Sequence, residues 1–279
     1  TLTGNLEAST PPPAPSHLLT LPEEPENRVD GVNFDSIKVA GHFINNANMT
    51  LKADGAEAIE LDTMDGQNAD RSIILGDFVN NGRLNVEGVG VSGINITDAD
   101  IGMPLPPEAP ELSLKPTDDD YNLGSVINNG SISVKDSMKA DHEDFEDPRA
   151  GISIENSHIY GEVVNKGSIF VEGLETKGIA ISQGNGFQGR VDGDVVNKGR
   201  IHVKGERVEA LSLEDIAFGH DIENSGTLVA EGSYAIAVHA DGTNVHRLKN
   251  TGSIIARGEE ARAIKLNGSS FPGYDFFAA

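Results

Sequence analysis

Two runs of acidic residues are the sequence's strongest candidates for binding a metal ion. Ca²⁺ prefers several flexible oxygen ligands, and these runs place many carboxylates close together in the chain. No EF-hand spacing and no glycine-rich nonapeptide repeat accompanies them. We therefore favour a solvated acidic surface, expect no other cofactor, and keep Ca²⁺ as the single ion to test. The candidate ligands are Asp118, Asp119, Asp120, Asp141, Glu143, Asp144, Glu146 and Asp147.

Two histidines share one position in a repeated pattern. His220 and His246 each stand four residues before an asparagine, Asn224 and Asn250. Rings on adjacent repeats would be neighbours, but two histidines do not complete a closed zinc site. We expect exposed, stacked rings rather than a metal centre.

Pairs of carboxylates raise the possibility of polysaccharide cleavage. A glycoside hydrolase needs two carboxylates about 5–10 Å apart, and Asp192 with Asp194, or Glu214 with Asp215, have suitable composition. Such pairs arise by chance among 44 acidic residues. No Ser–His–Asp arrangement or phosphate-binding glycine loop is recognisable, and tryptophan is absent. We expect no enzymatic activity and no catalytic residue, with a polysaccharide lyase, hydrolase or tailspike-like depolymerase as the alternative.

One asparagine recurs along most of the chain, at spacings of 35, 48, 37, 32, 27 and 26 residues. A catalytic group is needed once, so seven copies indicate a structural role. Each asparagine either faces inward in a stacked amide ladder or occupies a left-handed turn. Glycine stands two residues later in every copy except at Ala47, and we expect a positive φ there. The seven positions are Asn45, Asn80, Asn128, Asn165, Asn197, Asn224 and Asn250.

Apolar columns flank this asparagine and indicate strands. Residues two before, four after and six after it are apolar in all seven copies, and the intervening residues are mostly polar. This alternation predicts a strand with one buried face. A second strand follows, as in GINI (93–96) and GIAI (178–181), and a third precedes the asparagine. We therefore expect an all-β, right-handed parallel β-helix, a solenoid of about seven three-strand coils.

Composition excludes several classes of partner. The formal charge of −23 repels nucleic acid phosphates and anionic lipid. There is no cysteine, which excludes disulfides and thiolate metal sites. No run approaches the roughly 18 apolar residues of a membrane helix, so we expect no membrane span.

The pattern V-x-N-x-G-x-I-x-V-x-G, followed by A/G-I-x-I, resembles the degenerate repeats of autotransporter (type V secretion) passenger domains. The clearest copies are GEVVNKGSIFVEG (161–173) and GDVVNKGRIHVKG (193–205), and the resemblance covers 37–266. It implies an extracellular or outer-surface location in a Gram-negative bacterium, with adhesion or self-association. The family's leader and its translocating C-terminal domain are not recognisable, so we expect a processed passenger or a fragment.

The repeat boundaries divide the chain into three parts. Residues 1–28 form a Pro-rich N-terminal arm or linker, and 29–270 form the β-helix with excursions at 97–121 and 136–149. Residues 271–279 form an aromatic cap or docking segment. We expect a surface scaffold or adhesin whose function lies in the excursions and the ends. Its partners would be further copies of itself or a ligand on a host or neighbouring cell. The docking residues are Phe271, Tyr274, Phe276 and Phe277.

Overall fold

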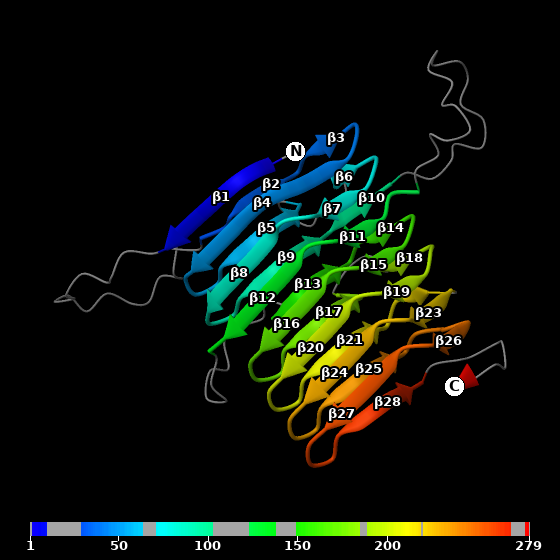
Figure 1. Cartoon of the computed structure of the whole chain (residues 1–279). Coiled ribbons are helices and arrows are strands. Elements are labelled where there is room, and N and C mark those ends of the chain that lie inside the picture. The colour runs from blue at the N-terminus through cyan, green and yellow to red at the C-terminus, as the bar shows by residue number, and fades with distance from the viewer. Residues whose placement is uncertain are drawn as a thin grey trace, which may run out of the picture.

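The computed structural model of the chain is all-β in the part that it describes. It describes residues 2–9, 29–63, 71–102, 123–137, 149–184, 189–218, 220–268 and 277–278. Every regular element in these ranges is a β-strand, and every strand pair is parallel. The strands stack in order from one end of the molecule to the other (Figure 1).

Sheet A has 15 strands, and the asparagine repeat runs through it. The long strand β4 (Phe43–Lys52) pairs with both β7 and β8 and so joins two rows. The row that contains the asparagines consists of β7 (Phe78–Asn80), β11 (Val126–Asn128), β15 (Val163–Asn165), β19 (Val195–Asn197), β23 (Asp221–Asn224), β26 (Arg247–Asn250) and β29 (Phe277–Ala278). The row that follows the asparagines consists of β8 (Arg83–Gly88), β12 (Ser131–Asp136), β16 (Ser168–Glu172), β20 (Arg200–Lys204), β24 (Thr227–Glu231) and β27 (Ser253–Arg257).

Sheets B and C contain the remaining described strands. The eight strands of sheet B are β2 (Val32–Asp35), β5 (Glu57–Asp62), β9 (Ser92–Thr97), β13 (Ala150–Glu155), β17 (Lys177–Ser182), β21 (Glu209–Glu214), β25 (Ile236–Asp241) and β28 (Arg262–Asn267). The six strands of sheet C are β3 (Lys38–Val39), β6 (Ser72–Ile74), β10 (Ala99–Ile101), β14 (His158–Ile159), β18 (Arg190–Val191) and β22 (Ala217–Phe218).

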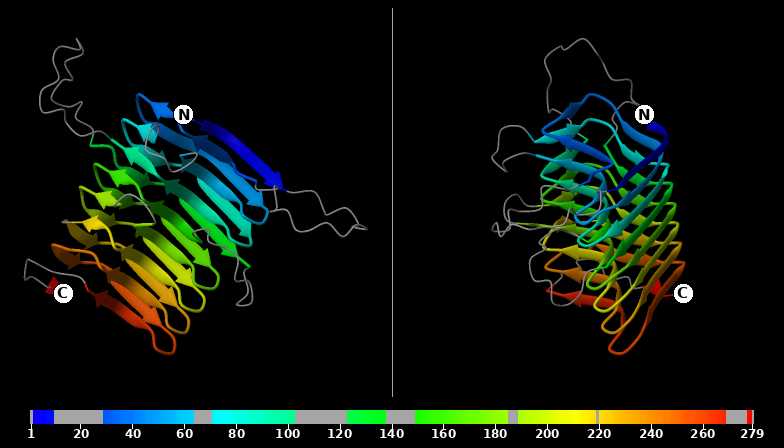
Figure 2. Two further views of the ribbon diagram at one scale, coloured as in Figure 1. Left: turned by 180° about the vertical axis from the view of Figure 1, so that it is seen from behind. Right: turned by 90° about the vertical axis from the view of Figure 1, so that its left-hand side faces the viewer.

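The path of one repeat explains the parallel pairing. The chain passes through β7, β8, β9 and β10 in turn, and β11 then returns beside β7 with Asn128 against Asn80. Each later repeat lies against the one before it, as both views in Figure 2 show. Long parallel sheets built from sequential repeats are consistent with a β-helix or solenoid-like fold.

The core is a column of aliphatic side chains between the sheets. Met49, Leu84, Ile132, Ile169 and Ile201 follow one another in the register of sheet A, and each is at most 1% exposed. Burying each such side chain contributes about 1.5–3 kcal/mol. These residues were predicted to face inward from their alternation with polar neighbours.

The glycine two residues after each asparagine has a different role from the one predicted. None of these glycines has a positive φ; the glycines that do include Gly205 and Gly232, elsewhere in the repeat. A Cβ at Gly167 would lie 1.9 Å from the carbonyl oxygen of Gly130 in the preceding repeat. Side chains are therefore excluded because neighbouring backbones approach closely at this corner.

Left-handed residues instead form the corner between sheets B and C. Ser36, Asp98, Asn156 and Asp215 follow strands of sheet B directly, with φ between 50° and 53°. Asparagine and aspartate tolerate this conformation better than most residues with a side chain. The corner therefore has a sequence signal of its own, separate from the asparagine repeat.

Two segments that were predicted to lie outside the coils contain strands. Residues 2–9 of the N-terminal arm form β1 (Leu2–Ser9), which pairs with β4 and places Gly4 beside Ala47. The excursion predicted over 97–121 starts later, since Ala99–Ile101 is strand β10. The described chain stops at Gly102 and resumes at Leu123.

Candidate functional site

The seven asparagines form one hydrogen-bonded ladder along sheet A. The Nδ2 atom of each donates to the Oδ1 atom of the next, at 2.7–2.9 Å, in all six links from Asn45 to Asn250. The amide also bonds its own chain two residues later, as Asn80 does with the N–H of Gly82 at 3.2 Å. None of the seven has a positive φ. Of the two roles left open by the sequence, the structure therefore has the stacked ladder.

A second, exposed amide ladder runs beside the first over three repeats. Asn81 donates to Asn46, and Asn129 donates to Asn81, both at 2.8 Å. This ladder was not predicted from the sequence. Its signal was the doubled asparagine at 45–46, 80–81 and 128–129.

Another column of sheet A alternates in charge. It lies seven residues after each asparagine, and the strand register places its members directly opposite one another. Lys52 lies 3.1 Å from Glu87, and Lys204 lies 3.4 Å from Glu172. Hydrogen bonding and charge from Lys52 lower the pKa of Glu87. The members in order are Lys52, Glu87, Lys135, Glu172, Lys204, Glu231 and Arg257.

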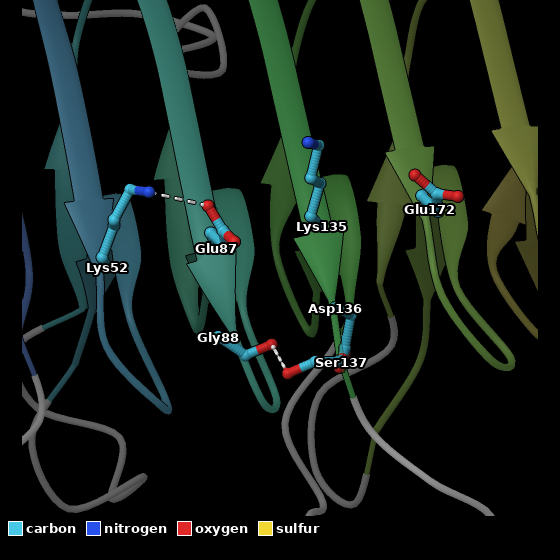
Figure 3. Close-up of a pocket in the computed structure, with 7 residues that line it drawn as sticks. All are labelled: Lys52, Glu87, Gly88, Lys135, Asp136, Ser137 and Glu172. Carbon is cyan, nitrogen blue, oxygen red and sulfur yellow. Dashed lines mark hydrogen bonds and ion pairs between the residues drawn. The ribbon is translucent and has the colours of Figure 1, made fainter.

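A shallow surface hollow lies over this charged column (Figure 3). Its lining combines two lysines with three acidic residues, and Ser137 donates to the carbonyl oxygen of Gly88 at 3.0 Å. Because each charge of the column stands beside one of opposite sign, the column itself favours neither an anion nor a cation. The best explanation of the column is that its ion pairs stabilise the register between repeats. The lining residues are Lys52, Glu87, Gly88, Lys135, Asp136, Ser137 and Glu172.

The outer face of sheet B carries a denser polar cluster. Glu209 and Glu214 lie on β21, and His239 lies on β25 beside it. The Nδ1 atom of His239 is 2.8 Å from Oε1 of Glu209. The Nζ atom of Lys177 is 2.6 Å from Oε1 of Glu214, to which Ser212 also donates at 2.8 Å.

Both carboxylates of this cluster are held in the ionised form. Burial alone would raise the pKa of Glu209, but contacts with His239 and Ser212 and the charge of Lys177 bring it below its usual range. Burial likewise opposes ionisation of Glu214. The charge and hydrogen bond of Lys177, with the hydroxyl of Ser212, lower the pKa of Glu214 nonetheless. The cluster therefore presents two carboxylates and one imidazole at a partly enclosed surface.

In the first carboxylate pair considered for catalysis, Asp192 and Asp194 have different polar partners. Asp192 is held by Arg190 and by His158, whose Nε2 lies 2.8 Å away. Although burial alone would raise the pKa of Asp192, these contacts lower it. Asp194 instead accepts the backbone N–H of Asp221 at 3.0 Å.

In the second pair, Glu214 is bound by Lys177, as described above, and Asp215 is a corner residue. Its φ of 53° places it at the turn between sheets B and C. Its backbone N–H donates to the carbonyl oxygen of Asp241 at 2.9 Å, so Asp215 has a structural role at this turn.

The two histidines of the repeat contact aspartates. His246 Nδ1 lies 2.8 Å from Oδ1 of Asp221, which also binds Arg247. His220 Nδ1 lies 3.9 Å from Oδ1 of Asp194. Both rings are about half exposed, with side-chain exposures of 48% and 54%. The expected exposure is therefore present, and each ring has an aspartate as its polar neighbour.

The remaining candidates fall largely beyond the described residues. All eight acidic residues considered for Ca²⁺ lie outside them, as do Phe271, Tyr274 and Phe276. Phe277 belongs to β29, where its backbone pairs with Lys249. The Ca²⁺ site and the aromatic docking segment stay predictions.

No family model, curated protein or solved structure matches this chain. Within the described ranges, no helix has the length and apolar character needed to cross a membrane. The class that the fold defines is therefore an all-β protein of long parallel sheets, stacked repeat on repeat.

Proposed function

We propose that this chain is a right-handed parallel β-helix of about seven three-strand coils that serves as a surface scaffold or adhesin. It would act outside the cell, secreted or on the outer surface of a Gram-negative bacterium. The resemblance of its repeats to autotransporter passengers motivates the location. The asparagine ladder and the alternating charged column support the scaffold role, because these repeated side chains bond to one another between repeats.

One observation carries the proposal: repeat length varies while strand register does not. The asparagine spacing ranges from 26 to 48 residues, yet Asn80, Asn128 and Asn165 remain opposite one another. The extra residues fall between β5 and β6, between β10 and β11, between β12 and β13 and between β17 and β18, never inside a described strand. Connections that vary over a constant scaffold are where binding surfaces form.

The segments between β10 and β11 and between β12 and β13 contain the acidic residues considered for Ca²⁺. Residues 103–122 and 138–148 therefore define the proposed binding region, for a second copy of the chain or for a cell-surface ligand. Ca²⁺ would act there by bridging carboxylates from adjacent connections. This places the proposed function in the connections and assigns the sheets to support.

Electron microscopy and analytical ultracentrifugation of the full chain, with and without Ca²⁺, test the proposal. The matched variants replace 103–122 or 138–148 with a short glycine–serine linker. We expect the full chain to assemble or to bind bacterial cells, and the variants to lose this while retaining their β-sheet circular dichroism. Monomers under all conditions, no cell binding and sugar release from a polysaccharide panel would contradict it and favour the enzyme.

A further inference from the structure

The outer face of sheet B contains side chains arranged as ligands around a common point. Glu209, Glu214 and His239 each offer a ligand atom, and these atoms all lie within 4.8 Å of one another. The register explains this proximity, because β21 and β25 place Ser212 beside His239, and Glu214 lies two residues beyond Ser212. We propose that these three residues bind one divalent transition-metal ion, of which Zn²⁺ is the type example.

Buried polar atoms without hydrogen bonds support the proposal independently of the cluster itself. His239 is only 7% exposed, and among the described residues neither ring nitrogen has a hydrogen-bond partner. Its Nδ1 approaches Oε1 of Glu209 to 2.8 Å without hydrogen-bond geometry, and Oε2 of Glu209 is also buried and unbonded. Such atoms are costly to bury. A cation bound by His239 and Glu209 would satisfy Nδ1 and Oε2.

The set of ligands favours a transition metal over Ca²⁺. Imidazole suits Zn²⁺ and its neighbours, whereas Ca²⁺ prefers oxygen ligands alone. Metal-bound histidine normally donates its other ring N–H to a carboxylate. Asp241 is the carboxylate on that side of the ring: its Oδ2 is 4.0 Å from Nε2 of His239, beyond hydrogen-bond distance, and would have to move closer to accept this hydrogen bond. The proposed ligand atom is Nδ1, because it faces Oε1 of Glu209 at 2.8 Å, and water would complete the coordination.

Lys177 is the natural competitor of the metal ion. The Nζ atom of Lys177 binds Oε1 of Glu214 at 2.6 Å. A metal ion must therefore displace Lys177 or bind the other carboxylate oxygen of Glu214. The surroundings nevertheless favour a cation, because three carboxylates stand against two lysines. The carboxylates are those of Glu209, Glu214 and Asp241, and the lysines are Lys177 and Lys265, which lies opposite His239 on β28. The site consists of sheet residues and is independent of the binding region proposed above.

Isothermal titration of the chelator-treated full chain with Zn²⁺ tests the site. We expect one saturable site whose Kd rises at least tenfold in His239→Gln and in Glu209→Gln. The matched control is His202→Gln, because His202 also contacts a glutamate, with Nε2 3.1 Å from Oε2 of Glu231. The control should leave the high-affinity site unchanged.

A gain in affinity provides the second measurement. Lys177→Gln frees Glu214 and should lower the Kd severalfold, and Co²⁺ bound to this variant should show ligand-field absorption bands that His239→Gln lacks. Equal Zn²⁺ affinity in the unsubstituted chain and His239→Gln would overturn the proposal, as would equal losses in His239→Gln and His202→Gln. Circular dichroism without metal establishes that each variant is folded.

Discussion

At the scale of single residues, an asparagine side chain contributes differently to stability on the buried and exposed faces of sheet A. Asn128 is fully buried, donating to Asn165 and accepting from Asn80, whereas the adjacent Asn129 is exposed and bonds Asn81. Water can replace the bonds of Asn129 but cannot reach those of Asn128. The buried asparagine ladder should therefore contribute more to the free energy of unfolding than the exposed one.

Asn128→Ala should lower the free energy of unfolding by about 1–3 kcal/mol, because it leaves a buried donor and acceptor without partners. Asn129→Ala, one residue away, should change it by less than about 0.5 kcal/mol. Urea unfolding followed by circular dichroism measures both. Equal effects of the two substitutions would show that the buried ladder has no special role.

Glycine at the corner after the asparagine is required by the neighbouring backbone. Gly167→Ala would place its Cβ 1.9 Å from the carbonyl oxygen of Gly130, so the repeats must separate locally. We expect a loss of about 1–3 kcal/mol from this overpacking. At Gly41 a Cβ meets nothing within 4 Å, so Gly41→Ala should be nearly neutral. Thermal unfolding of the two variants makes the comparison.

At the scale of elements, strand register decides which charges meet. Lys135 of β12 lies opposite Glu87 of β8 and Glu172 of β16. A shift of one residue would turn every inward side chain outward, and a misplaced repeat would bring like charges together. The alternating column therefore reinforces the register that the apolar columns define.

Lys135→Glu should destabilise the protein by about 0.2–1 kcal/mol for each of its two neighbours, since like charges then stand directly opposite. Lys135→Gln is the matched control and should cost less, because it removes attraction without adding repulsion. The difference between the variants should shrink in 1 M salt, where the screening length is about 3 Å. A difference independent of salt would point to packing instead.

At the scale of the whole molecule, stability should vary along the stack. Interior strands such as β16 and β20 have a neighbour on each side, whereas β28 has β25 as its one neighbour among the described strands. Ile264 of β28 is 40% exposed, while the corresponding Val238 of β25 is fully buried. Solenoids open from such ends, since each repeat contacts its neighbours only.

Hydrogen exchange measured by mass spectrometry should follow this gradient. Amides of β16 and β20 should exchange at least about tenfold more slowly than those of β27 and β28, because local opening requires less free energy at the end of the stack. Adding a stacking partner or raising protein concentration should protect β28 if copies associate end to end. Uniform exchange along the chain would instead indicate a single cooperative unit.

The repeat and the inward-facing columns could be derived from the sequence. Met49, Leu84 and Ile132 could be aligned without a structure because burial in a stacked fold imposes the same apolar pattern on every repeat. The alternating charges were also present in that alignment, seven residues after each asparagine. Their pairing became evident only from the register of sheet A, which places opposite charges next to one another.

The tertiary structure alone decided the features that depend on contacts between repeats. Gly167 was expected to need an unusual φ, but its requirement comes from the backbone of Gly130, which no local pattern specifies. Glu209 and His239 are 30 residues apart and share no motif. They meet because β21 and β25 are neighbours whose register brings both side chains to one face. The spacing of residues along the chain predicts individual strands, whereas the residues of this site come from neighbouring strands in different repeats.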